Sequence, residues 1–188
     1  MTNTAILIFF AVVNVVVTGL FAGVLLSQYL RRHRVYQLYW SIALAMAFIG
    51  TLSYVLMVAV GPTTTAGEAL FRIYYIFGAA LTAAWLGLGS IALISSARIT
   101  RISLLVLSVL SILAIVFISI SGIDTGQLSH VAGTAGKGVL QTGAWLAMII
   151  ILNTLGAVAV VGVAIYSGWK LIRRQSANFY TSKFLWAN

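Results

Sequence analysis

The sequence has 188 residues, of which 62% are hydrophobic and 7% are charged, with 11 Lys and Arg against 2 Asp and Glu. A soluble domain carries about 25% charged residues, which keep its surface hydrated. The composition therefore excludes a water-soluble globule, a disordered chain and a soluble nucleic-acid-binding protein, and it predicts an integral membrane protein.

Five segments are long and apolar enough to cross a bilayer as helices, which takes roughly 20 residues each. In chain order they are residues 4–28, 38–60, 71–95, 102–121 and 145–167. We predict an all-α, polytopic bundle of five transmembrane helices that occupies residues 1–169. Residues 170–188 form a basic, aromatic tail, which we expect to lie at the membrane surface or to begin a further helix.

The basic residues indicate how the helices are oriented, because short cytoplasmic loops of membrane proteins are enriched in Lys and Arg. On the opposite side, Arg72 and Lys137 are balanced by Glu68 and Asp124. We therefore predict that the N-terminus lies outside, that the C-terminus is cytoplasmic, and that the basic side attracts anionic lipid headgroups. The basic residues that follow the first, third and fifth segments are Arg31, Arg32, Arg34, Arg98, Arg101, Lys170, Arg173, Arg174 and Lys183.

Small residues predict where the helices contact one another, since they let two backbones approach closely in lipid. Gly19 and Gly23 form a GxxxG motif in the first segment, Gly78 lies in the third, and Gly156 and Gly162 lie in the fifth. We expect these contacts within one chain, with a dimer interface as the alternative. The fourth segment is rich in Leu, Ile and Val, and we expect it to face lipid more than the others.

Three larger side chains lie deep in the predicted spans. Asn14 and Asn153 carry amides that need a hydrogen-bond partner there, and a bond between the two would join the first helix to the fifth. Trp85 is close to the middle of the third span, where we expect it to pack in the core. The alternative is that these three residues line a pocket for a small molecule or a lipid.

The connections on the outer side suggest local structure. Thr65 and Glu68 fit a capping box, in which Thr65 caps the third helix and Glu68 reaches back to it. Glu68 can also pair with Arg72, which is one helical turn away, and a role of this pair as an outer gate is the alternative. The glycine-rich residues 122–143 are expected to form a solvated, flexible loop, with a small polar site at Asp124 and His130 as the alternative.

The sequence offers little chemistry inside the membrane. No ionisable residue lies near the centre of a predicted span, which argues against a proton relay. His33 and His130 fall on opposite sides of the bilayer, so they cannot hold a haem together. The chain has no cysteine. We therefore predict no catalytic residues, no cofactor, no metal and no nucleic-acid partner.

Three stretches carry a resemblance when they are taken together. They run from Tyr36 to Leu44, from Leu70 to Gly78, and from Leu152 through Gly156 to Trp169. In order and spacing they resemble a group of multi-pass membrane proteins of actinobacterial and Chloroflexota type. The resemblance implies a bacterial inner-membrane location and no particular activity. A weaker likeness is to the seven-helix sensor regions that precede some bacterial histidine kinases.

Members of this group continue past a stretch like Ala177–Asn178 into two more helices. The resemblance therefore leaves open that the chain is five helices of a seven-helix protein, whose ends would have the same orientation.

The leading functional hypothesis is a non-enzymatic accessory or assembly subunit of a membrane complex, which binds other membrane subunits or a second copy of itself. The alternative is a small-molecule or lipid sensor or carrier with a pocket at Asn14, Trp85 and Asn153. A third hypothesis, an intramembrane enzyme, requires polar groups that converge at one depth.

Overall fold

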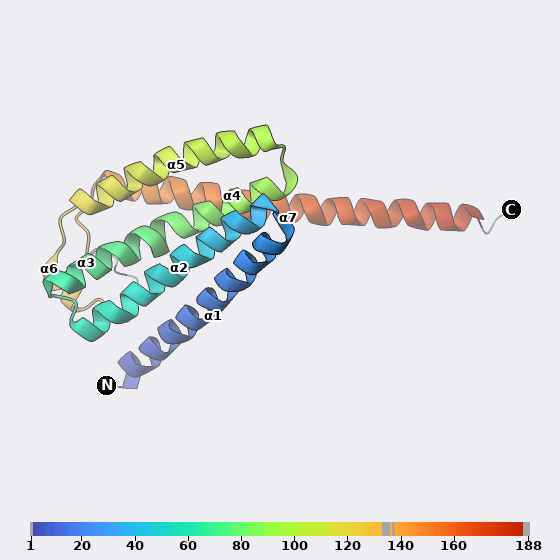
Figure 1. Ribbon diagram of the computed structural model, residues 1–188. Coiled ribbons are helices and arrows are strands. Elements are labelled where there is room, and N and C mark those ends of the chain that lie inside the picture. Colours follow the sequence, from blue (N-terminus) through green and yellow to red (C-terminus); the bar gives the residue numbers. More distant parts are fainter. Residues whose placement is uncertain (1, 133–135, 137, 186–188) are drawn as a thin grey trace.

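The computed structural model describes residues 2–132, 136 and 138–185, and side chains within residues 8–132, 136 and 138–173. The long helices lie side by side and form one bundle, from which the C-terminal helix extends (Figure 1). The described elements are α1 (Thr2–Arg32), α2 (Val35–Val60), α3 (Thr65–Tyr74), η1 (Tyr75–Leu81), α4 (Thr82–Ile94), α5 (Ala97–Ile120), α6 (Thr125–Ser129) and α7 (Ala144–Leu185).

Five of the described helices are long and apolar enough to cross a membrane, which confirms the predicted all-α bundle of five spans. In the third span, α3, η1 and α4 follow one another without a break. Four of the spans are longer than the predicted segments because they include polar turns at their ends, such as residues 97–101. Arginine side chains in such turns can cover apolar surface with their stems while the charge stays in water. The spans are Ile8–Arg32, Val35–Val60, Thr65–Ile94, Ala97–Ile120 and Ala144–Arg173.

The third span is the centre of the bundle. In its most apolar stretch 44% of the residues are buried, against 22% for α2 and for α5, 17% for α7 and none for α1. Helix α1 packs along α2 at the periphery. The expectation that the fourth segment faces lipid most is therefore wrong, because α1 is the more exposed helix. Apolar residues serve equally well against lipid and against a neighbouring helix, so composition does not separate the two positions.

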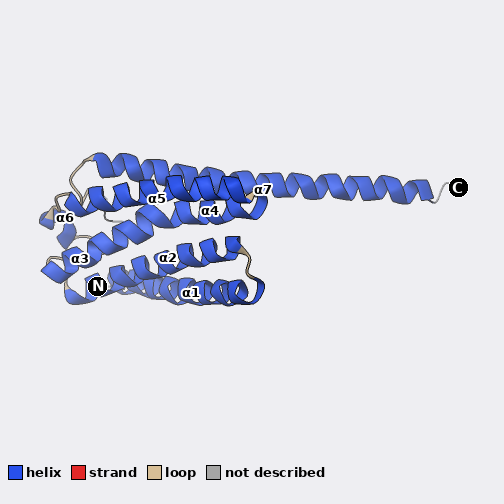
Figure 2. Cartoon of the chain, turned by 45° about the horizontal axis from the view of Figure 1, so that its top comes forward, coloured by secondary structure: helices blue, strands red, loops and turns tan. Residues whose placement is uncertain are grey.

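The turns between helices gather at two ends of the bundle (Figures 1 and 2). We call the end that holds residues 61–64 and 121–143 the loop end. We call the other end the basic end; it holds residues 33–34 and 95–96, and α7 leaves the bundle there. Among the described residues no strand is present, and the single β-bridge pairs Ile123 with Leu140.

The connection at the loop end packs onto the helices. Asp124 donates its backbone N–H to Val139 O at 2.8 Å, and Gln141 donates to Gly122 O at 3.0 Å. The described part of this connection is thus packed against the helices through part of its length, whereas its glycines predicted a solvated, flexible loop. Its aliphatic side chains gain enough burial to hold it against Phe71 and Trp145. Those at most 3% exposed are Leu128, Val131, Val139 and Leu140.

At the basic end, α7 continues as one helix of 42 residues to Leu185. Leu152 and Val163 are among the side chains of α7 that are buried in the bundle, and no side chain that the structure describes after Val163 is buried. The predicted tail from residue 170 thus prolongs the last spanning helix as far as Leu185, and residues 186–188 lie outside the described part. The division at residue 169 into a bundle and a tail remains a prediction.

Candidate functional site

The middle of the bundle contains a π-helical stretch, η1, between α3 and α4. The wider turn is visible in the hydroxyl of Thr82, which donates to Phe77 O, five residues earlier, at 2.6 Å. On the neighbouring helix, Asn153 Nδ2 donates to Ala79 O at 3.0 Å. Since π-helical turns displace carbonyls from the regular α-helical ladder, these two side chains stabilise the stretch. Asn153 therefore joins α7 to the central span.

Asn14, Trp85 and Asn153 do not meet, so the pocket predicted from them is wrong. Asn14 lies on an exposed part of α1, where its backbone carbonyl accepts a hydrogen bond from Thr18 Oγ1 at 2.7 Å. Trp85 is packed against the core as expected, and its Nε1 lies 3.4 Å from Ser111 Oγ on α5. The side chains of Asn153 and Trp85 bond to two different elements, Asn153 to η1 and Trp85 to α5, and the amides of Asn14 and Asn153 do not face each other.

Two of the predicted glycine contacts hold helices together within the chain. A Cβ on Gly156 would overlap the carbonyl of Ala83, and a Cβ on Gly87 would lie 2.8 Å from Gly156 Cα. A Cβ on Gly50 would lie 2.7 Å from Gly78 N. Glycine is therefore required where α7 crosses α4 and where α2 crosses η1, because any larger residue would separate the backbones.

The other predicted glycines are less engaged. A Cβ on Gly19 would touch the ring of Phe48 at 3.0 Å, whereas Gly23 and Gly162 have no atom within 4 Å of a Cβ position. Both of these residues are exposed. The GxxxG motif thus contributes one of its glycines to packing inside the chain, and a face of α7 that carries Gly162 is open.

The cap of α3 differs by one residue from the prediction. Thr64, not Thr65, is the N-cap, and its Oγ1 accepts a hydrogen bond from Gly67 N at 3.0 Å. The chain folds back at this point so closely that a Cβ on Gly67 would overlap Gly61 O. Consecutive threonines offer equivalent caps, and this close turn selects Thr64.

Arg72 joins the loop-end halves of two spans. Its Nη1 donates to Ile118 O at 2.8 Å and to Ser119 O at 2.6 Å, in the last turn of α5. These carbonyls have no partner within their own helix, and the negative end of a helix favours a cation. The structure describes both Glu68 and Arg72, and it contains no ion pair between them. The predicted pair, and with it the outer gate, is wrong.

Asp124 has a structural partner as well. Its carboxylate accepts hydrogen bonds from Gly126 N at 2.9 Å and Gln127 N at 3.2 Å, and it caps α6. The backbone of α6 therefore holds the Asp124 carboxylate, and the structure does not show a polar site that it shares with His130. In the part of the chain that the structure describes, no three His, Cys, Asp or Glu side chains gather.

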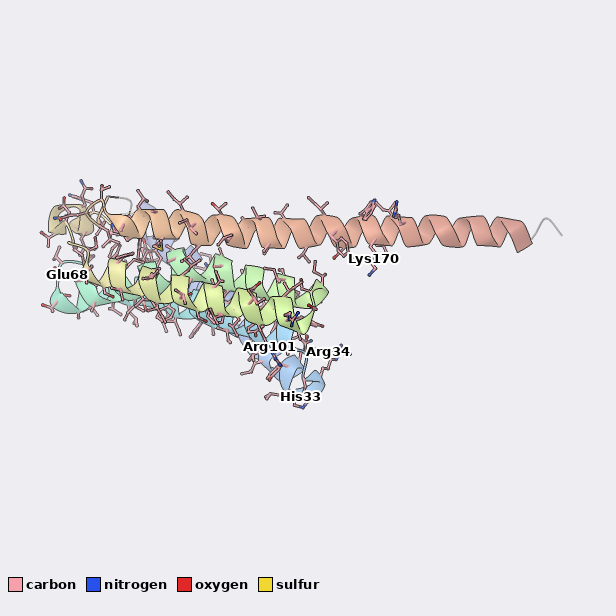
Figure 3. The ribbon with its side chains drawn as sticks, turned by 90° about the horizontal axis from the view of Figure 1, so that it is seen from above. His33, Arg34, Glu68, Arg101 and Lys170 are labelled. Carbon is pink, nitrogen blue, oxygen red and sulfur yellow. The ribbon has the colours of Figure 1, made fainter. Side chains whose placement is uncertain are left out.

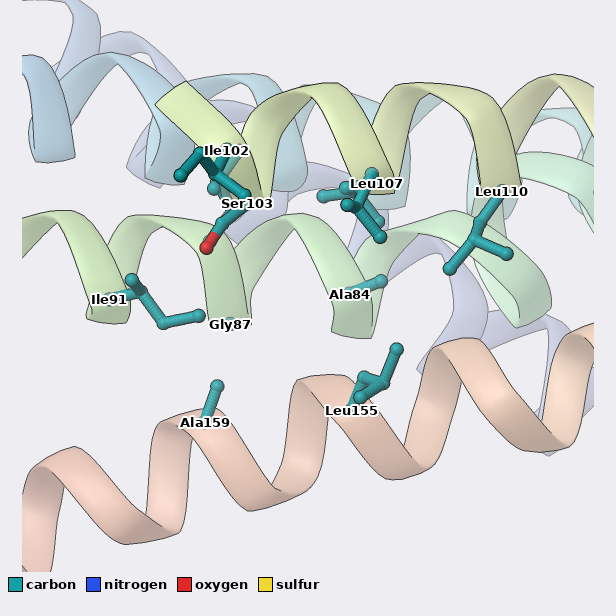
Figure 4. A pocket seen from close by; sticks show the side chains of 11 residues that line it. Ala84, Gly87, Ile91, Ile102, Ser103, Leu107, Leu110, Leu155 and Ala159 are labelled. Carbon is teal, nitrogen blue, oxygen red and sulfur yellow. The ribbon is translucent and has the colours of Figure 1, made fainter. Parts of the chain in front are cut away.

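An apolar hollow lies between α4, α5 and α7 (Figure 4). Its volume is about 230 Å³, and Gly87 on α4 and Ala159 on α7 are among the small residues that leave it open. Ser103 of α5 contributes a hydroxyl, and most of the other lining side chains are aliphatic. Pockets for small molecules usually measure about 300–1,000 Å³, so this one suits no more than part of an acyl chain or a side chain.

A second hollow, of about 470 Å³, lies at the basic end between the α1–α2 turn and the α4–α5 turn. We call it the basic pocket. Its polar and basic lining residues are His33, Arg34, Tyr36, Tyr39, Ser95, Thr100 and Arg101. His33, Arg34 and Arg101 lie near one another, at the opposite end from Glu68 (Figure 3). The sequence placed these residues on one side of the membrane, but it gave no sign that two separate turns form one pocket.

Comparisons with models of protein families, with curated proteins and with solved structures found no match. The family, the bacterial source and the inner-membrane location that the resemblance implied therefore remain predictions. The structure itself shows a chain with five apolar helices, consistent with a multi-pass integral membrane protein.

Proposed function

We propose that this chain is a non-enzymatic subunit of a complex in the bacterial inner membrane, where it binds another membrane-spanning chain or a second copy of itself. Its N-terminus faces outward and its C-terminus lies in the cytoplasm. The observation that carries the proposal is the length of α7, which runs beyond the bundle as a single helix (Figure 1).

Aromatic and basic side chains mark where α7 leaves the bilayer. Arg173 lies over the ring of Trp169, 4.3 Å from its centroid, and Lys170 lies 5.9 Å from the centroid of Tyr166. Tyr and Trp favour the headgroup region, and basic residues favour its cytoplasmic side. The helix between Arg173 and Leu185 therefore projects from the membrane.

A projecting helix of this length needs a partner. Most helical stability in proteins comes from packing, and no side chain of α7 that the structure describes after Val163 is buried. The surface of α7 has room for one at Gly162 and at Gly168, since neither glycine has an atom within 4 Å of a Cβ position. Another helix can approach its backbone closely there.

Mass measurement after cross-linking tests the proposal. The full chain is cross-linked in its native membrane, extracted in a mild detergent and measured by light scattering. We expect a protein mass well above that of the 20.1 kDa monomer. A solitary monomer, with or without cross-linking, would contradict the proposal.

A cysteine placed on α7 locates the contact, because the chain contains no cysteine of its own. Gly168→Cys should form a cross-link to a partner, whereas Leu105→Cys, on an exposed part of α5, should not. Equal cross-linking of both variants would place the contact elsewhere.

A further inference from the structure

We propose that the basic pocket binds the phosphate group of an anionic phospholipid, with Arg34 and Arg101 as the residues that hold it. This site is separate from the contact surface on α7, and it does not depend on the function proposed above.

The pocket is formed by two turns that are distant in the sequence. His33 has a backbone φ of 51°, and its N–H donates to Tyr29 O at 2.7 Å, which ends α1 and reverses the chain. Arg34 follows as the N-cap of α2. Arg101 comes from the first turns of α5, and both arginines line the same hollow. Its volume of about 470 Å³ lies within the range of small-molecule sites, about 300–1,000 Å³.

No carboxylate side chain of this chain lies beside the charges in the pocket. The sequence contains 2 carboxylate side chains in all, those of Glu68 and Asp124. Both lie at the loop end, and Asp124 is engaged in capping α6. Arg34 and Arg101 are both exposed, and two like charges that line one hollow favour an anion between them. A bidentate guanidinium is well suited to the oxygens of a phosphate.

The start of α5 adds to this positive potential. Its N-cap, Ser96, makes no side-chain hydrogen bond to the first turn, although its carbonyl accepts from Thr100 N at 3.0 Å. The first N–H groups of the helix are therefore not capped by that side chain, and they point toward the end where Ala97 lines the pocket. The positive end of a helix favours an anion.

The walls of the pocket favour a lipid over a soluble anion. Val35, Tyr36, Tyr39, Ala92 and Leu93 contribute apolar and aromatic surface beside the arginines. Leu93 is 44% exposed, so that surface continues to the outside of the bundle. A phospholipid can place its phosphate between the arginines and its acyl chains along this surface, whereas inorganic phosphate gains nothing from it.

The test uses the purified full chain in dodecyl maltoside, titrated with dioleoylphosphatidylglycerol while the melting temperature is followed. The pocket variant is Arg34→Gln with Arg101→Gln. The matched control is Arg31→Gln with Arg98→Gln, which removes the same charge from exposed residues at the same end that do not line the pocket. Dioleoylphosphatidylcholine and sodium phosphate at equal ionic strength are titrated in parallel.

We expect the lipid concentration at half-saturation to rise about 30-fold in the pocket variant, which corresponds to about 1 kcal/mol for each arginine. It should rise less than about 3-fold in the control, and Arg34→Lys with Arg101→Lys should bind more tightly than the glutamine variant. Equal weakening in both glutamine variants would show a diffuse electrostatic attraction and overturn the site. Stabilisation by sodium phosphate as strong as that by the lipid would overturn the lipid as ligand.

Discussion

The loop end and the basic end of the bundle are closed in different ways. At the loop end, a long connection covers the helices with buried aliphatic side chains, and Arg72 and Asp124 are engaged with backbone groups. At the basic end, short turns leave a hollow of about 470 Å³ whose arginines face no carboxylate from this chain. At the loop end the basic and acidic side chains are equal in number, and the connection packs onto the helices. At the basic end the positive charge is not balanced by acidic side chains, so it is available to groups outside the chain.

The orientation of the two ends gives the largest expected effect, since labelling is close to all-or-none. Gln127→Cys at the loop end should react with a membrane-impermeant maleimide in intact cells. Ser96→Cys at the basic end should react only after the membrane is permeabilised, because basic turns are retained in the cytoplasm. Both positions are exposed in the structure. The reverse pattern would invert the proposed topology.

Truncation of a leucine should affect the two ends unequally. Leu128→Ala, in the packed connection, should lower the free energy of unfolding by about 2–5 kcal/mol, because it removes a side chain with no exposed surface. Leu93→Ala is the control at the basic end, where the leucine is 44% exposed, and it should cost less than about 1 kcal/mol. Denaturation by SDS in detergent micelles measures both. Equal losses would mean that the loop end is no better packed than the basic end.

The guanidinium of Arg72 provides the next effect. Arg72→Met should lower the free energy of unfolding by roughly 1.5–3 kcal/mol, since the carbonyls of Ile118 and Ser119 lose a charged donor. Glu68→Gln should change it by less than about 0.5 kcal/mol, because Glu68 is not the partner of Arg72. The same SDS titration distinguishes the two. A similar loss for both variants would restore the ion pair between them.

The smallest effect is expected at the turn between α1 and α2. His33→Gly should raise the free energy of unfolding by roughly 0.5–1 kcal/mol, because the backbone φ of 51° costs a side chain energy that glycine does not pay. Thermal unfolding in micelles should show a higher melting temperature. A lower one would mean that the imidazole of His33 stabilises the basic end.

The number and order of the spans followed from the sequence, whereas their arrangement did not. In the hydrocarbon core a helix must satisfy its own backbone hydrogen bonds and carry apolar side chains, so a run of about 20 apolar residues predicts a span. The same runs hide which face is buried, because lipid and protein neighbours select similar side chains. The sequence therefore does not distinguish α1 from α5, or Asn14 from Asn153.

The local errors have equally physical causes. Thr64 and Thr65 can each cap a helix, and only the close approach of Gly67 to Gly61 selects the first. The connection at the loop end has no regular hydrophobic period, so its buried side chains did not stand out among the glycines. Nothing in residues 75–81 predicts a π-helix, although the position of Asn153 deep in a span predicts that its amide needs a partner.

The extent of α7 has a mechanical consequence. Its last described buried side chain is Val163, and the helix continues to Leu185, which at 1.5 Å per residue is about 33 Å further along the axis. If the packed part of this helix tilts by about 10°, simple geometry displaces Leu185 sideways by about 6 Å. A small tilt of α7 at the Gly87–Gly156 crossing therefore moves the far end of the helix by about the size of a side chain.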